Sequence, residues 1–132
     1  MSKVLILMGS ESDRERMEKA VPILNDAGVE TEVIVSSAHR DPDRTAELAR
    51  TARDNGFGVV ICGAGLSAAL PGVVAAHTKL PVIGVPLNAA LGGLDALLSV
   101  AQMPPGVPVA CVGIDNAKNA AHLALRILGK AG

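Results

Sequence analysis

The chain contains 132 residues, and a hydrophobic fraction of 49% with only 19% charged residues excludes an intrinsically disordered protein. Twelve basic against thirteen acidic residues leave a net charge of −1, and Phe57 is the sole aromatic residue. We therefore expect neither nucleic acid nor a membrane as a partner, because no basic patch stands out and base-stacking rings are lacking. The apolar excess in so short a chain predicts a homo-oligomer that buries surface between subunits.

The two cysteines, Cys62 and Cys111, lie inside apolar runs without any paired C-x-x-C spacing. This pattern predicts two buried, reduced thiols and no structural zinc site. No signal peptide precedes the first predicted strand, and no apolar segment reaches membrane-spanning length without Gly, Pro or charge. We therefore expect a cytoplasmic protein.

In the first half of the chain the sequence predicts alternating strands and helices. Short continuous apolar runs are typical of buried strands. Ser12 with Glu15 three residues later forms a capping box that predicts a helix, and Asp41 followed by Pro42 predicts the next one. The predicted strands span 4–8, 29–35 and 59–62, and the predicted helices span 12–28 and 41–56.

The alternation continues in the second half, where Pro104 and Pro105 end one helix and Asp115 or Asn116 caps the last. The predicted strands span 81–85 and 107–112, and the predicted helices span 71–78, 94–101 and 117–128. Five apolar strands separated by helices favour a parallel sheet with right-handed crossovers. We predict a single α/β domain over 1–132, a three-layer doubly wound parallel sheet of flavodoxin-like or Rossmann-like type.

Ligands of such a sheet bind beyond the carboxyl ends of its strands, where the loops 9–13, 36–40, 63–72 and 86–93 lie. The first of these loops opens a helix, and helix N-termini favour phosphate. Ser10 and Ser12 add hydroxyl donors, and Asp13 suits a ribose hydroxyl as an acceptor. Ordinary capping is the alternative interpretation, and it accounts for Ser12 without a ligand.

The second loop places His39 beside Arg40 directly before a helix. Arginine forks onto phosphate oxygens, and histidine is suited to general acid–base chemistry near neutral pH. The alternative is a solvated histidine next to a surface arginine. The other two histidines, His77 and His122, are predicted to be surface residues on helices away from these loops.

The third loop contains Gly63-Ala-Gly-Leu-Ser-Ala68, a formal match to the dinucleotide-binding fingerprint. It follows the third strand, and no acidic residue lies about twenty positions further on, which disfavours a dinucleotide. Small residues here are expected instead to let the backbone approach a flat ligand closely.

Taken together, these loops and several later motifs resemble one family, the PurE family of purine biosynthesis. The matching segments are 8–13, 36–42, 68–72, 81–86, 93–99, 102–108 and 119–121. Their order and spacing cover nearly the whole chain, so the joint match is highly specific although each motif alone is weak.

The resemblance implies an activity on a small ribonucleotide. Family members convert carboxyaminoimidazole ribonucleotide to its ring-carboxylated isomer, or carboxylate aminoimidazole ribonucleotide directly with carbon dioxide. It implies no metal and no organic cofactor. Similar members form octamers with active sites at subunit contacts, which agrees with the apolar excess.

The resemblance also implies roles for individual residues. His39 is the acid–base residue, and the loop 63–70 covers the imidazole. The residues implied in substrate binding are Ser10, Ser12 and Asp13 at phosphate and ribose, Ser37 and Arg40 completing the phosphate cage, Ala38 between them, and Gly65, Ser67, Ala68, Ala69 and Leu70 in the third loop.

The third loop departs from the family pattern at Ala69, where the mutase branch usually has histidine. The run 65–69 is closer to the direct carboxylase branch, whereas Arg40 and the run 102–106 are similar to the mutase branch. The primary prediction is the mutase, and direct carboxylation stays open, as does a carboxylase for another nucleotide-like substrate. A catalytically inactive nucleotide-binding oligomer is a further alternative, and a signalling domain is disfavoured because strand three ends in Cys62 rather than in an aspartate.

Overall fold

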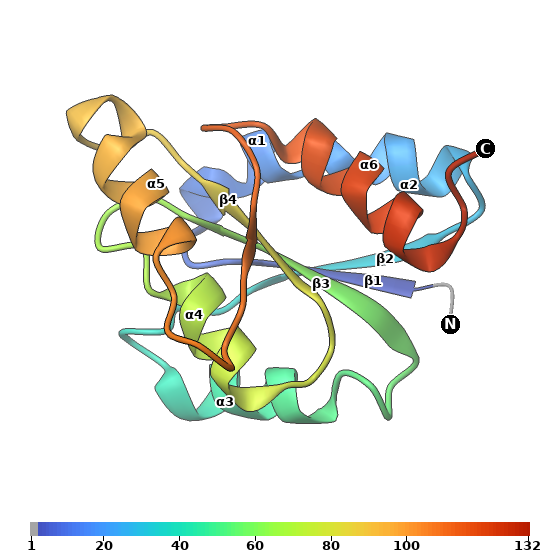
Figure 1. Ribbon diagram of the computed structural model, residues 1–132, viewed down its shortest axis with the longest axis horizontal. Helices are drawn as coiled ribbons and strands as arrows, with labels where there is room; N and C mark the ends of the chain where they lie inside the picture. Colours follow the sequence, from blue (N-terminus) through green and yellow to red (C-terminus); the bar gives the residue numbers. More distant parts are fainter. Residues whose placement is uncertain (1–2) are drawn as a thin grey trace.

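A five-stranded parallel sheet forms the centre of the computed structural model, which describes residues 3–132 (Figure 1). The strands are β1 (Lys3–Met8), β2 (Glu30–Val35), β3 (Phe57–Ala64), β4 (Val82–Pro86) and β5 (Ala110–Cys111), in the spatial order β2-β1-β3-β4-β5. Every neighbouring pair is parallel. The predicted α/β fold class is therefore confirmed.

Helices cover both faces of the sheet, and Figure 1 shows α2 and α6 on one side and α3 and α4 on the other. The helical elements are η1 (Glu11–Asp13), α1 (Arg14–Met17), α2 (Ala20–Asp26), α3 (Pro42–Thr51), α4 (Leu70–His77), η2 (Leu91–Gly93), α5 (Leu94–Ala101) and α6 (Ala117–Leu128), where η marks a 3₁₀ turn. This is the predicted three-layer arrangement.

The hydrophobic core is divided in two by the sheet, because successive side chains of a strand point to opposite faces. In β1, Val4 and Ile6 pack with α2 and α6, whereas Leu5 and Leu7 pack with α3, α4 and α5. Both sets are buried, so the sequence of β1 is a continuous apolar run and does not alternate between apolar and polar residues.

The strand order places a switch point between β1 and β3. The chain leaves β1 toward β2 on one side, then crosses to β3 on the other side of β1 and continues to β4 and β5. Loops that leave the sheet in opposite directions open a crevice at the carboxyl ends of the strands. The crevice of this fold therefore lies beyond β1 and β3.

The first predicted helix, 12–28, is wrong as a single element and is divided into η1, α1 and α2. Pro22 lies in the first turn of α2, where its ring cannot share a continuous helix with the carbonyl of Glu18 four residues earlier. The predicted capping box is also wrong. Ser10 occupies the extended cap position, and its Oγ accepts from the Ser12 backbone N–H at 3.3 Å.

Two predicted strands have different lengths in the structure. The edge strand predicted over 107–112 is reduced to Ala110–Cys111, because Pro108 has no N–H to donate to a ladder. Strand β3 runs on through Gly63 to Ala64, which the prediction placed in a loop. A Cβ at Gly63 would lie 2.3 Å from the Met17 Sδ, so this glycine admits the packing of α1 on the strand and not the approach of a ligand.

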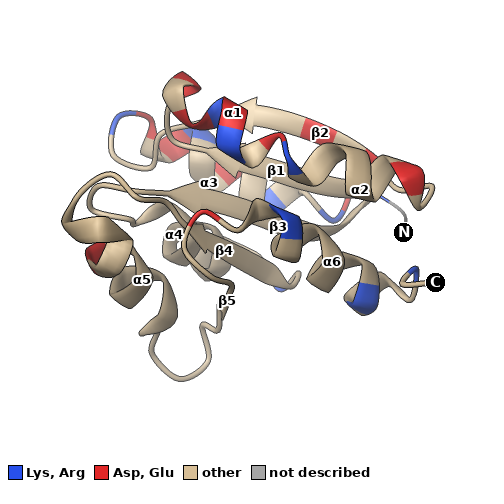
Figure 2. Ribbon diagram, turned by 90° about the horizontal axis from the view of Figure 1, so that it is seen from above, with Lys and Arg blue, Asp and Glu red and all other residues tan. Residues whose placement is uncertain are grey.

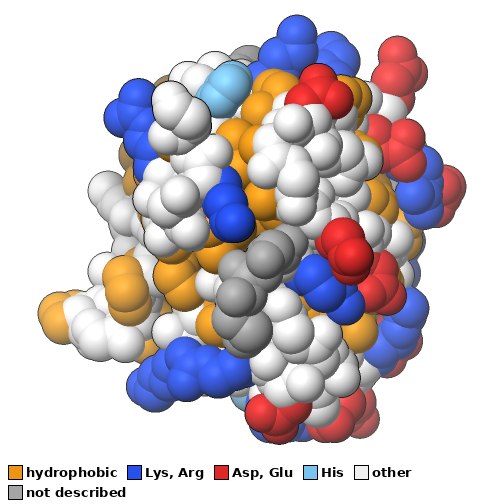
Figure 3. All heavy atoms as spheres, turned by 90° about the vertical axis from the view of Figure 1, so that its right-hand side faces the viewer, with side chains coloured by type: hydrophobic (Ala, Val, Ile, Leu, Met, Phe, Trp, Pro, Cys, Tyr) orange, Lys and Arg blue, Asp and Glu red, His pale blue; other side chains and the backbone are white. Residues whose placement is uncertain are grey.

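The last helix, α6, is confirmed with Asn116 as its cap, since the Asn116 side chain accepts from the Asn119 N–H at 2.9 Å. Within residues 3–132, none of the helices combines the length and the hydropathy needed to cross a bilayer. Figure 3 shows the end of the molecule that carries both termini, where acidic and basic side chains are scattered among apolar ones.

Candidate active site

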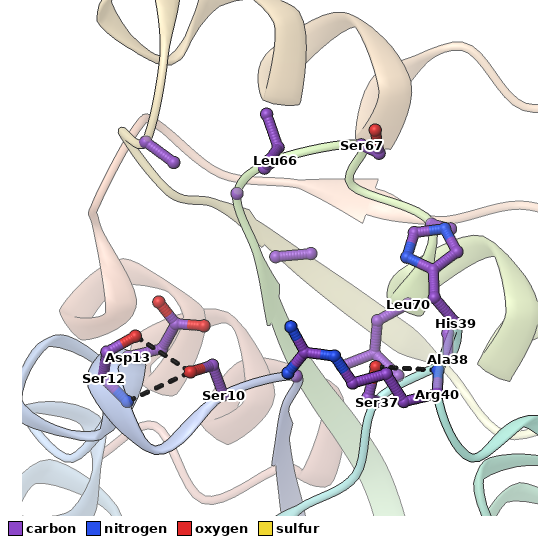
Figure 4. Close-up of a pocket in the computed structure, with 15 residues that line it drawn as sticks. Ser10, Ser12, Asp13, Ser37, Ala38, His39, Arg40, Leu66, Ser67 and Leu70 are labelled. Carbon is purple, nitrogen blue, oxygen red and sulfur yellow. Dashed lines mark hydrogen bonds between the residues drawn. The ribbon is translucent and has the colours of Figure 1, made fainter.

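A cavity of about 530 Å³ lies at the carboxyl ends of the strands, in the crevice that the topology predicts. Four loops line it, one after each of β1, β2, β3 and β4 (Figure 4). The lining residues are Gly9, Ser10, Ser12, Asp13, Ser37, Ala38, His39, Arg40, Ala64, Gly65, Leu66, Ser67, Ala69, Leu70 and Ala89. The loops predicted to form the site therefore meet in one cavity.

The loop after β1 brings two hydroxyls and a carboxylate to one wall of the cavity. The Ser10 and Ser12 Oγ atoms lie 2.9 Å apart, and the turn formed by η1 begins between them. The Asp13 side chain is only 15% exposed, and its Oδ1 accepts from the Arg16 Nη2 at 2.9 Å. This wall offers hydroxyl donors beside one anchored acceptor.

The loop after β2 is held in shape by Thr45 of α3. The Thr45 Oγ1 lies 2.7 Å from the buried Ser36 Oγ, and it donates to the Ser37 carbonyl oxygen at 3.2 Å. The Ser37 Oγ in turn accepts from the Arg40 backbone N–H at 3.1 Å. These bonds form a tight turn that presents the two residues between Ser37 and Arg40 toward the cavity.

His39 and Arg40 are both exposed, and their side chains project into the space between the loops (Figure 4). The Arg40 guanidinium extends toward Ser10, and the His39 ring lies on the side of Ser67. Across residues 3–132, Arg40 forms no ion pair with a carboxylate. Its charge therefore faces the cavity without a protein counter-ion.

The loop after β3 closes the cavity on the side opposite the serines. A Cβ at Gly65 would lie 2.9 Å from the Ala89 Cβ and 3.3 Å from the Leu87 carbonyl oxygen, so the loop packs directly on the segment after β4. Ser67 adopts a left-handed φ of 47°, which is uncommon for serine. Ala68 differs from its predicted neighbours, because it is buried in the core and does not line this cavity.

A family model described as AIR carboxylase matches residues 3–131. The chain belongs to this family. The resemblance to PurE proteins drawn from the loop motifs is thereby confirmed.

Individual relatives in the AIR carboxylase family include both enzyme types that the sequence left open. The chain is 60% identical over 129 residues to the N5-carboxyaminoimidazole ribonucleotide mutase of Pyrococcus abyssi, covering 97% of this chain and 74% of that protein. It is 54% identical over 124 residues to the phosphoribosylaminoimidazole carboxylase of Schizosaccharomyces pombe, covering 93% and 22% respectively. The crystal structure of Treponema denticola PurE superposes with a TM-score of 0.86 at 33% identity, covering 96% and 80%.

A second cavity of about 670 Å³ adjoins the first and shares His39, Ser67 and Ala69 with it. It continues along α4 as far as His77, whose Nδ1 lies 2.8 Å from the Val73 carbonyl oxygen. His77 is exposed as predicted and is the last residue of α4, but it shares this second cavity with His39 of the second loop and Ser67 of the third. His122 is exposed on α6 and lines neither cavity.

Both thiols are free and neither lines the main cavity of this AIR carboxylase family member. Cys62 is fully buried in β3, and this burial raises its pKa far above the usual range of a thiol. Cys111 is only partly buried, in contrast to the prediction, and burial raises its pKa as well. Neither sulfur is therefore prepared as a nucleophile.

Several lining residues were not singled out from the sequence, namely Gly9, Ala64, Leu66 and Ala89. They bring backbone or aliphatic groups and no titratable chemistry, so residue type alone gives no signal. Ala89 could have been found from its position, because it lies in the predicted loop after β4 at the correct end of the sheet.

Proposed function

We propose that this chain is an N5-carboxyaminoimidazole ribonucleotide mutase of purine biosynthesis, with His39 as its proton carrier. The observation that supports this proposal is the convergence of three serine-bearing loops, an exposed imidazole and a guanidinium without an ion pair among residues 3–132 on one cavity of an AIR carboxylase family member. The relative from Pyrococcus abyssi that bears the mutase name is 60% identical.

The phosphate of the ribonucleotide is assigned to the wall that carries Ser10, Ser12 and Arg40. Serine hydroxyls and a guanidinium fork form charge-assisted hydrogen bonds with phosphate oxygens. The Arg40 guanidinium extends toward Ser10, so both groups face the same volume (Figure 4). The Asp13 carboxylate would repel a phosphate and is assigned to the ribose hydroxyls next to it.

The heterocycle is assigned to the end of the cavity between His39 and the third loop. Gly65, Ser67, Ala69 and Leu70 line this end with backbone and small side chains, which suits a flat ring. Ala38 lies beside His39 on the opposite wall. Ala68 is left out of this assignment because it faces the core and the second cavity.

One imidazole is sufficient for the proton transfers of the mutase reaction. The carboxylate on the exocyclic amino nitrogen leaves as carbon dioxide when its N–C bond breaks, and that amino nitrogen takes a proton from the histidine. The neighbouring ring carbon then forms a C–C bond to carbon dioxide and becomes tetrahedral while it still bears its hydrogen. The histidine removes that proton and aromaticity returns, so the proton given in the first step is recovered in the last.

Direct carboxylation of aminoimidazole ribonucleotide by carbon dioxide is the other candidate, and the name of the Schizosaccharomyces pombe relative is the observation that favours it. Ala69 contributes only a methyl group between the two cavities, so no second imidazole comes from this position. The deciding assay supplies the carboxyamino isomer alone or aminoimidazole ribonucleotide with bicarbonate. The mutase forms product from the first mixture, and product from the second mixture only would contradict the proposal.

Replacement of the proton carrier tests the mechanism directly. His39→Asn keeps a similar shape but cannot transfer a proton, so we expect turnover to fall by about two to four orders of magnitude. Ribonucleotide affinity, measured by calorimetry, stays within about threefold of the wild type because the phosphate wall is intact. The matched control is His77→Asn, which lines only the second cavity and keeps turnover. Full activity of His39→Asn would remove His39 from the reaction.

We infer a homo-octamer, as the PurE resemblance implies, with carbon dioxide as a reaction partner held at sites close to subunit contacts. Exposed apolar side chains near the cavity support burial against another subunit, among them Leu66 at 72% and Leu91 at 79% exposure. The two free cysteines agree with a cytoplasmic compartment.

A further inference from the structure

Arg16 lies behind the wall of the cavity and contacts three different segments of the chain. Its Nη2 donates to the Asp13 Oδ1 at 2.9 Å, and its Nη1 donates to the Asp115 Oδ1 and to the Asn88 carbonyl oxygen, both at 3.1 Å. Asp13 lies three residues away on the same turn, but the other two partners are separated from Arg16 by 99 and 72 positions in sequence. The guanidinium therefore connects the loops after β1, β4 and β5.

The segment after β4 is held by the same group of residues. The Asn88 backbone N–H donates to the Asp115 Oδ1 at 2.9 Å, so one carboxylate oxygen receives both this bond and the one from Arg16. The next residue, Ala89, lines the cavity and packs against Gly65 of the third loop. The position of this wall thus depends on Asp115.

Asp115 is held in an unusual backbone conformation to make these contacts. Its φ is 59°, in the left-handed region that non-glycine residues seldom occupy. The Asp115 N–H donates to the Pro86 carbonyl oxygen at 2.8 Å, which anchors the residue to the end of β4. Asn116 caps α6 immediately after it, so Asp115 joins the last strand to the last helix. Aspartate is among the few non-glycine residues that adopt this conformation readily.

This cluster contains one positive and two negative charges. One guanidinium, 30% exposed, lies between two carboxylates whose side chains are 15% and 38% exposed, those of Asp13 and Asp115. Without the cation, two negative charges would face each other beside the wall assigned to phosphate. Because the Asp13 carboxylate is the more buried of the two, its orientation depends most on the guanidinium.

We propose that Arg16 and Asp115 are positioning residues that orient Asp13 for the ribose of the substrate. Arg16 binds only the Oδ1 of Asp13, and among residues 3–132 the hydrogen bonds leave the Oδ2 without a donor. This second oxygen accepts from a ribose hydroxyl, while Asp115 holds the segment around Ala89 as the facing wall. The inference rests on the proposed function, because it takes a ribonucleotide as the ligand.

The test compares two arginines of the same short helix. Arg16→Met removes the bonds to Asp13 and Asp115, and Arg14→Met is the matched control, because Arg14 binds Glu11 and Glu18 outside the cavity. In Figure 2 acidic and basic residues alternate along the ribbon at α1, the helix that contains both arginines. We expect Arg16→Met to raise the KM for the ribonucleotide about tenfold with kcat within about twofold, and Arg14→Met to change neither.

A ligand without ribose hydroxyls separates positioning from general damage to the fold. Inhibition constants are measured for aminoimidazole ribonucleotide and for its 2′,3′-dideoxy analogue with each variant. Arg16→Met is expected to lose about tenfold in affinity for the first and less than about twofold for the second. Equal losses for both ligands, or an unchanged KM, would overturn the positioning role.

A second variant covers the case in which Arg16→Met does not fold. Asp115→Asn keeps the shape of the side chain and an oxygen that accepts from Asn88, but it removes one charge from the contact with Arg16. The same ligand-dependent loss is expected, smaller at about threefold. If the wild type turns over the ribonucleotide and both variants keep its KM and inhibition constants, only the positioning role is rejected. If the wild type neither binds nor converts the ribonucleotide, the proposed function and the inference are rejected together.

Discussion

Gly84 in the middle of β4 shows how closely single residues determine the packing between layers. A Cβ at this position would lie 2.4 Å from the Val100 Cγ1 of α5, 3.0 Å from the Val109 Cγ1 and 3.3 Å from the Pro71 Cβ of α4. The first of these contacts is closer than carbon atoms approach each other, and the other two are tighter than ordinary van der Waals contact. The absence of a side chain is therefore what lets α5 and α4 lie against the strand.

The change Gly84→Ala is expected to destabilise the protein by about 1–3 kcal/mol, the usual cost of overpacking a buried site. The matched control is Gly113→Ala, since a Cβ there would have its nearest neighbour at an ordinary 3.8 Å and the backbone is not left-handed. Urea unfolding monitored by circular dichroism gives both free energies. A Gly84→Ala variant as stable as the control would show that the neighbouring side chains relax without cost.

Residue types in the loops were a good guide to chemistry but not to local hydrogen bonding. His39, Arg40 and the serines line the cavity as the sequence analysis expected. Ser12 does not cap a helix, because Ser10 takes the extended cap position. Two serines only two residues apart are nearly equivalent as cap candidates in the sequence. Which of them caps depends on its backbone angles, and these are set by the packing of the surrounding chain.

At the level of elements, α6 and α3 begin in different ways although both have a capping residue in sequence. The Asn116 side chain accepts from the Asn119 N–H, which satisfies one free donor of the first turn of α6. Asp41 stands at the cap position of α3, but its side chain makes no capping hydrogen bond. The two caps therefore differ in energy despite similar sequence signals.

We expect Asn116→Ala to cost about 1 kcal/mol of stability, because the Asn119 donor loses its partner. Asp41→Ala is the matched control, and a change of less than about 0.5 kcal/mol is expected there. Thermal unfolding of both variants checks this difference. Equal destabilisation by the two changes would mean that the hydrogen bond from the Asn119 N–H to the Asn116 side chain contributes little.

Element positions were well predicted wherever local patterns decide them. The apolar runs of β1, β3 and β4 are recognisable because both faces of these strands are buried. The division of the first helix and the short β5 were not predicted. A proline early in a helix and a proline in an edge strand act through missing or displaced hydrogen bonds with partners that the sequence pattern does not specify.

At the level of the whole molecule, apolar side chains remain exposed at the end that carries the cavity. Leu91 and Leu94 of η2 and α5 are 79% and 54% exposed, and Leu66 of the third loop is 72% exposed. A small chain seldom leaves large aliphatic groups in water beside a cavity unless another surface covers them. These residues are the expected contact in the proposed octamer.

Light scattering is expected to give the mass of eight chains of 13.4 kDa. Leu91→Glu places a charge in the expected contact and should shift the mass toward smaller species at little cost to the folded subunit, since this side chain is already exposed. Ile127→Glu on α6, near the C-terminal end of the molecule, is the control and should leave the mass unchanged (Figure 1). A wild-type mass of a single chain would contradict the octamer.

The sequence by itself determined the fold class, the order of strands and helices, and the loops that meet at the site. Those features depend on apolar runs, prolines and motifs that are read within a few residues, and on the rule that parallel strands bring their carboxyl ends to one edge. Only the tertiary structure decided that Arg16 binds Asp115 and that His77 shares a cavity with His39. Such contacts depend on how the crossover helices dock across the sheet, which no local pattern encodes.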